Sequence, residues 1–278
     1  MVFSDFVYSQ RDIVAGKNFI NSGASFEHVD GKYAELNGIK IYYEEYGAGD
    51  PLLLIHGNGG SVESFNNQIN FFSKKYHVIV ADNRGQGKTI NTLDSLTYEM
   101  MADDYFLLLN ELDIDSANIV GWSDGGIIGL MMAINYPHKV KMLAVMGANL
   151  SPDTSAVREE AIEWVKRQIK MDKDSIKAGK TKFKSDLQLM NLLYHQPNID
   201  VVMLHSISIP VLVMSGDRDI IKLQHTLLIY QNIPQAQLSV FPGSTHFIVE
   251  ESPVVFNNTV MRFFSRPFKM PDSINEFK

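Results

Sequence analysis

The segment Gly121-Trp122-Ser123-Asp124-Gly125 contains the residue types needed for nucleophilic chemistry. It fits the pattern G-x-S-x-G, in which a sharp turn between a strand and a helix exposes a serine hydroxyl in strained geometry. Glycine is needed two residues before and after the serine, because side chains there would collide where strand and helix converge. The apolar run from Asn118 to Val120 precedes the motif, and a helical pattern follows it. The sequence therefore predicts Ser123 as a nucleophile.

A serine hydroxyl is a weak nucleophile at neutral pH and needs a base, which in turn needs an orienting acid. When the serine lies on such a turn, the acid and then the histidine follow it along the chain. Asp217 and Asp219 come directly after a predicted strand at 211–215, and His246 follows another predicted strand at 237–241. The carboxyl ends of strands are where ligand sites gather in open α/β sheets. We therefore expect His246 as the base and one of the two aspartates as the acid.

The glycine-rich segment His56-Gly57-Asn58-Gly59-Gly60 follows an apolar strand predicted at 52–55. Such a loop can direct a backbone N–H group at the oxygen that becomes negative in a tetrahedral intermediate. We expect the N–H groups of Asn58 and Asp124 to form this oxyanion hole. We interpret His56 as a structural residue that holds the loop through buried hydrogen bonds.

The elements that must position these residues are apolar strands alternating with amphipathic helices, from about residue 31 onward. This alternation indicates an α/β fold, with a mostly parallel sheet covered by helices on both faces. We predict strands at 39–46, 52–55, 77–81, 118–121, 140–146, 211–215 and 237–241, and helices at 61–73, 97–112, 125–136, 222–232 and 253–264.

One region, residues 151–205, has helical patterns but no convincing strand. We predict that it forms a small helical cap inserted between two strands of the sheet. The α/β core then comprises residues 31–150 and 206–278. Residues 1–30 form an N-terminal extension to which the sequence assigns no role.

The composition is that of an ordinary globular protein, with 45% hydrophobic and 21% charged residues. The net charge of −7 argues against a nucleic-acid partner. The chain has no cysteine, which excludes disulfides, thiolate metal sites and a cysteine nucleophile. No histidine and carboxylate cluster has metal-ligand spacing, and the expected chemistry needs no cofactor. The partner that we expect is a small-molecule ester.

No apolar run approaches the roughly 18 residues of a membrane span. Residues 1–20 include Asp5, Arg11 and Asp12 and lack the continuous apolar stretch of an intact signal peptide. We expect a cytoplasmic protein, or an exported one whose signal peptide has been removed. The oligomeric state is not readable from the sequence.

From about residue 33 to 265 the chain resembles the α/β-hydrolase superfamily. The resemblance is carried by the loop after His56, the segment Asp82-Asn83-Arg84-Gly85-Gln86-Gly87, the turn at Ser123, the turn at 216–219 and the loop at 244–246. In family members with a matching turn, the acid is the residue three after the glycine, and this implies Asp219, with Asp217 as the runner-up. Some relatives carry the acid after the earlier strand. Here that region reads Gly147-Ala148-Asn149 and has no carboxylate, which supports Asp219.

Residues 121–126 are similar to the corresponding turn of the valacyclovir hydrolase and biphenyl-hydrolase-like group. That resemblance implies esters of α-amino acids as candidate substrates. A carboxylate of Asp124 at the rim of the site could pair with a substrate ammonium group. The alternative is that Asp124 caps the helix that begins at Gly125, where an acid favours the positive end of the helix dipole.

The mechanism that we predict is cleavage of an ester through an acyl-enzyme on Ser123, with His246 as base and Asp219 as its orienting acid. Two alternatives remain. The same three residues could serve a carbon–carbon bond or lactone hydrolase, or the chain could be a ligand sensor on a hydrolase scaffold.

Overall fold

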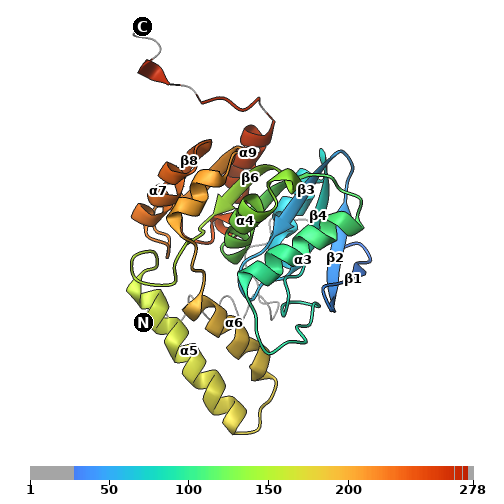
Figure 1. Ribbon diagram of the computed structural model, residues 1–278, viewed down its shortest axis with the longest axis vertical. Helices are drawn as coiled ribbons and strands as arrows, with labels where there is room; N and C mark the ends of the chain where they lie inside the picture. Colours follow the sequence, from blue (N-terminus) through green and yellow to red (C-terminus); the bar gives the residue numbers. More distant parts are fainter. Residues whose placement is uncertain (1–27, 266, 271, 275–278) are drawn as a thin grey trace.

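A computed structural model describes residues 28–265, 267–270 and 272–274. Of the predicted N-terminal extension, residues 1–27 lie outside the described residues. Within the described part the strands form one eight-stranded sheet, in the order β1-β2-β4-β3-β5-β6-β7-β8 (Figure 1). The strands are β1 Lys32–Leu36, β2 Ile39–Tyr46, β3 Asp50–Ile55, β4 Tyr76–Ala81, β5 Ala117–Trp122, β6 Val140–Met146, β7 Val211–Gly216 and β8 Ala236–Phe241.

All neighbouring pairs from β4 to β8 are parallel, whereas β1 and β2 run antiparallel to their neighbours. The carboxyl ends of β3, β5, β7 and β8 therefore lie along one edge of the sheet. This edge is where the loops that carry the predicted site residues begin.

Helices cover both faces of the sheet, which is why its central strands are apolar throughout. On one face, α3, α4 and α7 contribute to a buried hydrophobic cluster, and on the other face η1, α2, α8 and α9 contribute to a second one. The helices are α2 Asn66–Phe72, α3 Tyr98–Glu111, α4 Asp124–Asn135, α5 Glu159–Lys177, α6 Phe183–His195, α7 Leu223–Asn232, α8 Ile248–Glu251 and α9 Pro253–Phe264, with the 3-10 turns η1 Val62–Phe65, η2 Pro137–Lys139 and η3 Val201–Ser206.

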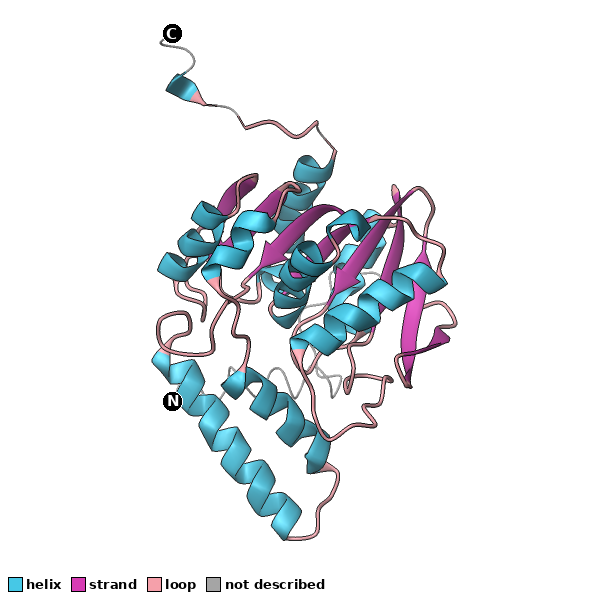
Figure 2. Cartoon of the chain, viewed as in Figure 1, coloured by secondary structure: helices cyan, strands magenta, loops and turns pink. Residues whose placement is uncertain are grey.

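Between β6 and β7 the chain forms α5, α6 and η3, which fall almost entirely in the segment 151–205. Helices α5 and α6 pack against each other and project beyond the sheet as a pair (Figure 2). Leu189 and Leu192 of α6 join the hydrophobic cluster of the core. We call residues 159–195 the α5–α6 pair.

Several elements differ from the sequence-based expectation, and the short helices η2 and α8 were not predicted. The helix predicted at 61–73 is a 3-10 turn followed by a short α-helix, because Phe65 at the junction has φ −112° and ψ 19°. Strand β1 was not predicted, since its alternation of polar residues is weak evidence for a strand. Its signal is the turn at Asn37-Gly38, where both residues have positive φ, as two-residue hairpins between antiparallel strands require.

Candidate active site

Ser123 lies at the junction of β5 and α4 with φ 57° and ψ −117°, a conformation that non-glycine residues rarely adopt. A side chain on Gly121 would collide with the backbone of Gly125, and one on Gly125 would collide with the backbone of Ile55. Strand and helix converge here so closely that both positions need glycine. Such strained backbone persists where the surrounding structure holds it, and it clusters at functional sites.

The structure brings His246 and Asp219 to Ser123. His246 Nε2 lies 2.9 Å from Ser123 Oγ, and His246 Nδ1 lies 2.7 Å from Asp219 Oδ1. Asp219 also accepts hydrogen bonds from the N–H of Ile221 at 2.9 Å and from the hydroxyl of Ser215 at 3.4 Å. These bonds hold the carboxylate in one orientation against the imidazole. Asp217, the runner-up for the acid, is exposed.

Space for the imidazole is made by Gly147, which directly follows β6. An added Cβ at this position would lie 2.7 Å from the ring of His246, and Gly147 has φ 64°. In the sequence, residues 147–149 are notable only for the absence of a carboxylate. The available signal was a glycine placed directly after a strand that neighbours β5.

The carbonyl of His246 accepts a hydrogen bond of 2.8 Å from the indole N–H of Trp122. The ring of Trp122 also packs edge-on against Phe247, with centroids 5.7 Å apart. Trp122, which directly precedes Ser123 in the chain, therefore contacts His246 and Phe247. It connects β5 directly to the loop that carries the histidine.

The loop from Gly57 to Ser61 lies against the elbow, since an added Cβ on Gly57 would be 3.1 Å from the Cβ of Ser123. His56, which directly follows β3, supports this loop and is fully buried. Its Nε2 accepts the N–H of Asn83 at 3.0 Å, so that its Nδ1 is left to donate to the carbonyl of Gly57 at 2.8 Å. Burial lowers the pKa of His56 to about 4, which keeps the ring neutral and both bonds intact.

Asp124 differs from the expected rim position, because its side chain is only 1% exposed. Its carboxylate accepts hydrogen bonds from Asn58 Nδ2 at 2.9 Å and from the hydroxyl of Tyr98 at 2.8 Å. Burial raises the pKa of Asp124 to about 6 in spite of these donors. Tyr98 was missed by sequence reasoning, and the only signal was its place in the first turn of a helix capped by Thr97.

A cavity of about 110 Å³ lies over Ser123 and His246. Polar groups of Asn58, Tyr98 and Asp124 contribute to its lining, together with apolar side chains of the α5–α6 pair. The two residues predicted as oxyanion donors thus lie at this cavity beside the nucleophile.

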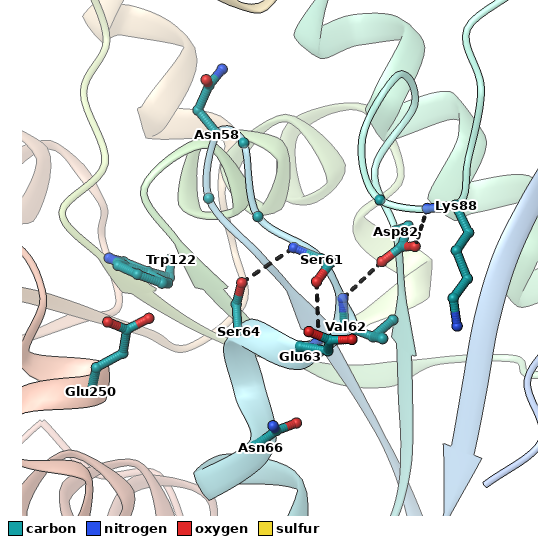
Figure 3. Close-up of a pocket in the computed structure, with 14 residues that line it drawn as sticks. Asn58, Ser61, Val62, Glu63, Ser64, Asn66, Asp82, Lys88, Trp122 and Glu250 are labelled. Carbon is teal, nitrogen blue, oxygen red and sulfur yellow. Dashed lines mark hydrogen bonds between the residues drawn. The ribbon is translucent and has the colours of Figure 1, made fainter. Parts of the chain in front are cut away.

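A larger cavity of about 430 Å³ has Asn58 in common with the first one but is not lined by Ser123 or His246 (Figure 3). Asp82 lies on its wall and accepts the N–H groups of Val62 at 2.7 Å and Lys88 at 2.6 Å. Burial raises the pKa of Asp82 to about 6. The bond to Val62 joins the loop after β4 to the start of η1, so Asp82 supports the end of the loop that contains Asn58.

Across residues 28–265 and the short described stretches after them, no group of three or more histidine, aspartate and glutamate side chains could hold a metal ion. None of the helices in this part of the chain is long and apolar enough to cross a membrane.

The chain is similar to hydrolases of several kinds. It is 32% identical to a putative carbamate hydrolase, RutD, of Azorhizobium caulinodans over 41% of this chain and 43% of that protein. It is 33% identical to (E)-2-((N-methylformamido)methylene)succinate hydrolase of Acinetobacter baylyi over 46% of this chain and 48% of that protein. The chain thus spans about half the length of these two relatives. With the human serine hydrolase BPHL it shares 27% identity over 76% of this chain and 78% of that one.

Solved structures share the fold. The enol-lactonase from Burkholderia xenovorans LB400 superposes with a TM-score of 0.72 at 18% identity, over 84% of this chain and all of that chain. A thermophilic esterase from Thermogutta terrifontis gives a TM-score of 0.70 at 22% identity, over 87% of this chain and all of that chain.

The family model of the alpha/beta hydrolase fold matches residues 50–198, from β3 to the end of α6. This match takes in the loop after His56, the elbow at Ser123 and the α5–α6 pair. The matched residues make up more than half of the 278-residue chain, and the chain therefore belongs to the α/β-hydrolase family.

Proposed function

We propose that this protein is a serine hydrolase that cleaves a carboxylic ester through an acyl-enzyme on Ser123. The observation that carries the proposal is the continuous series of contacts from Ser123 Oγ to His246 at 2.9 Å and from His246 to Asp219 at 2.7 Å. This is the arrangement of nucleophile, base and orienting acid that acyl transfer requires.

In the proposed reaction, Ser123 Oγ attacks the ester carbonyl while His246 Nε2 takes the hydroxyl proton. Asp219 accepts the Nδ1–H bond, which keeps Nε2 free as the proton acceptor and stabilises the imidazolium that forms. The tetrahedral intermediate collapses as His246 returns the proton to the departing alkoxide. Water, deprotonated by His246, then attacks the acyl-enzyme and releases the acid and free Ser123.

The oxyanion of each tetrahedral intermediate would bind to the backbone N–H groups of Asn58 and Asp124. Donors that are already in place where charge develops contribute to catalysis because they need no reorganisation during the reaction. The segment 151–205 acts as a cap that covers this site, since the α5–α6 pair supplies much of the cavity wall.

Esters of α-amino acids are the second candidate, and the observation that favours them is the carboxyl group of Asp124 at the cavity. Above about pH 6 this carboxyl is ionised. A buried anion near the reacting carbonyl would attract an ammonium group on the acyl part of the substrate.

The test is hydrolysis of p-nitrophenyl esters and α-amino acid esters by wild type and Ser123→Ala, with Ser239→Ala on β8 as a matched serine control. We expect turnover by wild type and the control and none above background by Ser123→Ala. Activity of Ser123→Ala equal to wild type would refute the nucleophile. If wild type were inactive on both ester classes, diketone and lactone panels would test the carbon–carbon and lactone alternatives. A ligand that raised Tm without any product would favour the sensor.

A further inference from the structure

The cavity over Ser123 is lined by residues of the α/β core and of the α5–α6 pair. The core contributes the polar residues Asn58, Tyr98 and Asp124, and also the apolar residues Ile220, Ile221 and Phe247. The α5–α6 pair contributes a mostly apolar wall from Ala161, Ile162, Trp164, Val165 and Leu193. An acyl group bound to Ser123 must therefore fit between the core residues around the nucleophile and this mostly apolar wall.

The size of the cavity limits what can enter. An apolar cavity of about 150 Å³ in another protein holds one benzene molecule, which has six carbon atoms. At the same packing, about 110 Å³ holds about four or five non-hydrogen atoms. An acetyl group has three such atoms, a propionyl group four and a butyryl group five, whereas longer chains would need the wall to move.

Both helices of the wall are attached to the core near the site. On α6, Gln188 Nε2 donates to the carbonyls of Leu93 at 2.9 Å and Asp94 at 3.1 Å, and Leu189 is buried in the core cluster. Asn58 Nδ2 lies 3.5 Å from the carbonyl of Leu189.

The start of α5 is attached just beyond Asp219. The N–H of Arg158 donates to the carbonyl of Ile220 at 2.9 Å, and the N–H of Lys222 donates to the carbonyl of Ala156 at 2.8 Å. The wall is thus tied to the segment that carries the predicted acid, and moving it outward would break these backbone bonds.

From the volume, the lining and these attachments we infer that the site selects short acyl groups, from acetyl to butyryl, with Trp164 setting the upper limit. This inference rests on the proposed ester hydrolysis and adds the substrate class. Trp164 is the largest side chain that α5 places at the cavity, so its truncation removes the most wall volume. For an acyl group that also carries an ammonium, the same limit admits glycyl and alanyl groups.

The experiment compares kcat/KM for p-nitrophenyl acetate, butyrate, hexanoate and octanoate, which share one leaving group. We expect wild type to lose at least about tenfold between butyrate and octanoate, since misfit of single methylenes costs about 10- to 200-fold in enzyme pockets. Trp164→Ala should shift the maximum to hexanoate or longer. Met171→Ala is the matched control, because this α5 side chain is 55% exposed and should leave the profile as in wild type.

A wild-type maximum at octanoate would overturn the inference, as would a Trp164→Ala profile identical to wild type in a folded variant. Labelling of Ser123 by methyl and octyl phosphonofluoridates, read by mass spectrometry, separates the two proposals. Labelling by the methyl reagent alone supports the size limit. Equal labelling by both refutes the limit and leaves the nucleophile standing, whereas labelling by neither refutes both.

Discussion

The side-chain amide of Asn58 donates a hydrogen bond of 2.9 Å to the carboxylate of Asp124, so the two residues assigned to the oxyanion hole are also joined through their side chains. One lies on the loop after β3 and the other in the first turn of α4. The bond therefore helps to fix the distance between the two backbone N–H groups that would bind one oxygen atom in the proposed mechanism.

Asn58→Ala should consequently lower kcat about tenfold while changing KM little. The loss should be smaller than the 10²- to 10³-fold loss known for removal of an oxyanion donor itself, because both N–H groups remain. Asn257→Ala is the control, since this buried side chain makes comparable bonds with Gln68 and Asn67 away from the site. The control should lower Tm and leave kcat unchanged. Equal kcat losses in both variants would show a general effect of destabilisation.

The choice between the two aspartates after β7 can be decided by a matched pair of variants. Asp219→Asn should lower kcat by about 10³- to 10⁴-fold, because the amide would favour the wrong tautomer of His246. Asp217→Asn should retain wild-type kcat, since Asp217 is exposed. Steady-state kinetics with one ester measures both, and the reverse result would make Asp217 the acid.

The pKa of Asp124, raised by burial to about 6, predicts a pH dependence specific to ammonium substrates. The carboxyl is ionised above about pH 6 and gains a proton as the pH falls through this value, which removes its attraction for an ammonium group. KM for an alanine ester should therefore rise below about pH 6, and KM for the propionate ester of the same alcohol should not. In Asp124→Asn this difference should vanish. Parallel KM profiles in wild type would rule out ammonium recognition by Asp124.

The positions of Ser123, Asp219 and His246 were accessible from sequence because each follows an apolar strand of a parallel sheet. The strands that precede them lie close together in the sheet, so their carboxyl ends bring three distant segments to one edge. In the structure, the side chains of these segments are within hydrogen-bond distance. The fold class was predictable for the same reason, since the period of the hydrophobic pattern is a local property.

Contacts that depend on tertiary packing were not accessible. The hydroxyl of Tyr98 reaches Asp124 only because α3 begins beside the elbow, and no periodic pattern encodes that approach. Asp124 was expected at the rim because it directly follows the nucleophile, but its side chain is buried with two hydrogen-bond donors from distant segments. The cavity volume likewise depends on where the α5–α6 pair is attached.

The raised pKa of Glu250, on the wall of the larger cavity, leads us to expect that the stability of the protein depends on pH. Burial, with a contribution from the charge of Glu251, raises its pKa from 4.5 to about 7. Between these values the folded protein keeps a proton that the unfolded chain loses, so stability falls as pH rises through this range. Glu250→Gln should therefore raise Tm above pH 7, by about 2–4 °C for each kcal/mol regained. Near pH 4.5 the variant and wild type should melt alike.

The control for this comparison is Glu63→Gln, which changes an exposed carboxylate at the same cavity. Thermal melts of wild type, Glu250→Gln and Glu63→Gln, each above pH 7 and near pH 4.5, test whether ionisation of Glu250 lowers Tm. A gain in Tm for Glu250→Gln that is the same at both pH values would exclude ionisation of Glu250 as its cause.

Trp122 should act on kcat through the position of His246. Its indole N–H donates a 2.8 Å hydrogen bond to the carbonyl of His246, and Trp122→Phe removes that donor but keeps an aromatic ring against Phe247. A hydrogen bond of this kind contributes about 0.5–1.5 kcal/mol, which corresponds to a loss of about two- to tenfold in kcat if the bond serves to hold the imidazole. KM should stay the same, because the bond is made to the backbone of the histidine loop. Trp164→Phe gives the contrast, since it alters the apolar wall of the cavity over Ser123. It should change how KM depends on the length of the acyl chain. A Trp122→Phe variant with altered KM and wild-type kcat would assign Trp122 to substrate binding instead.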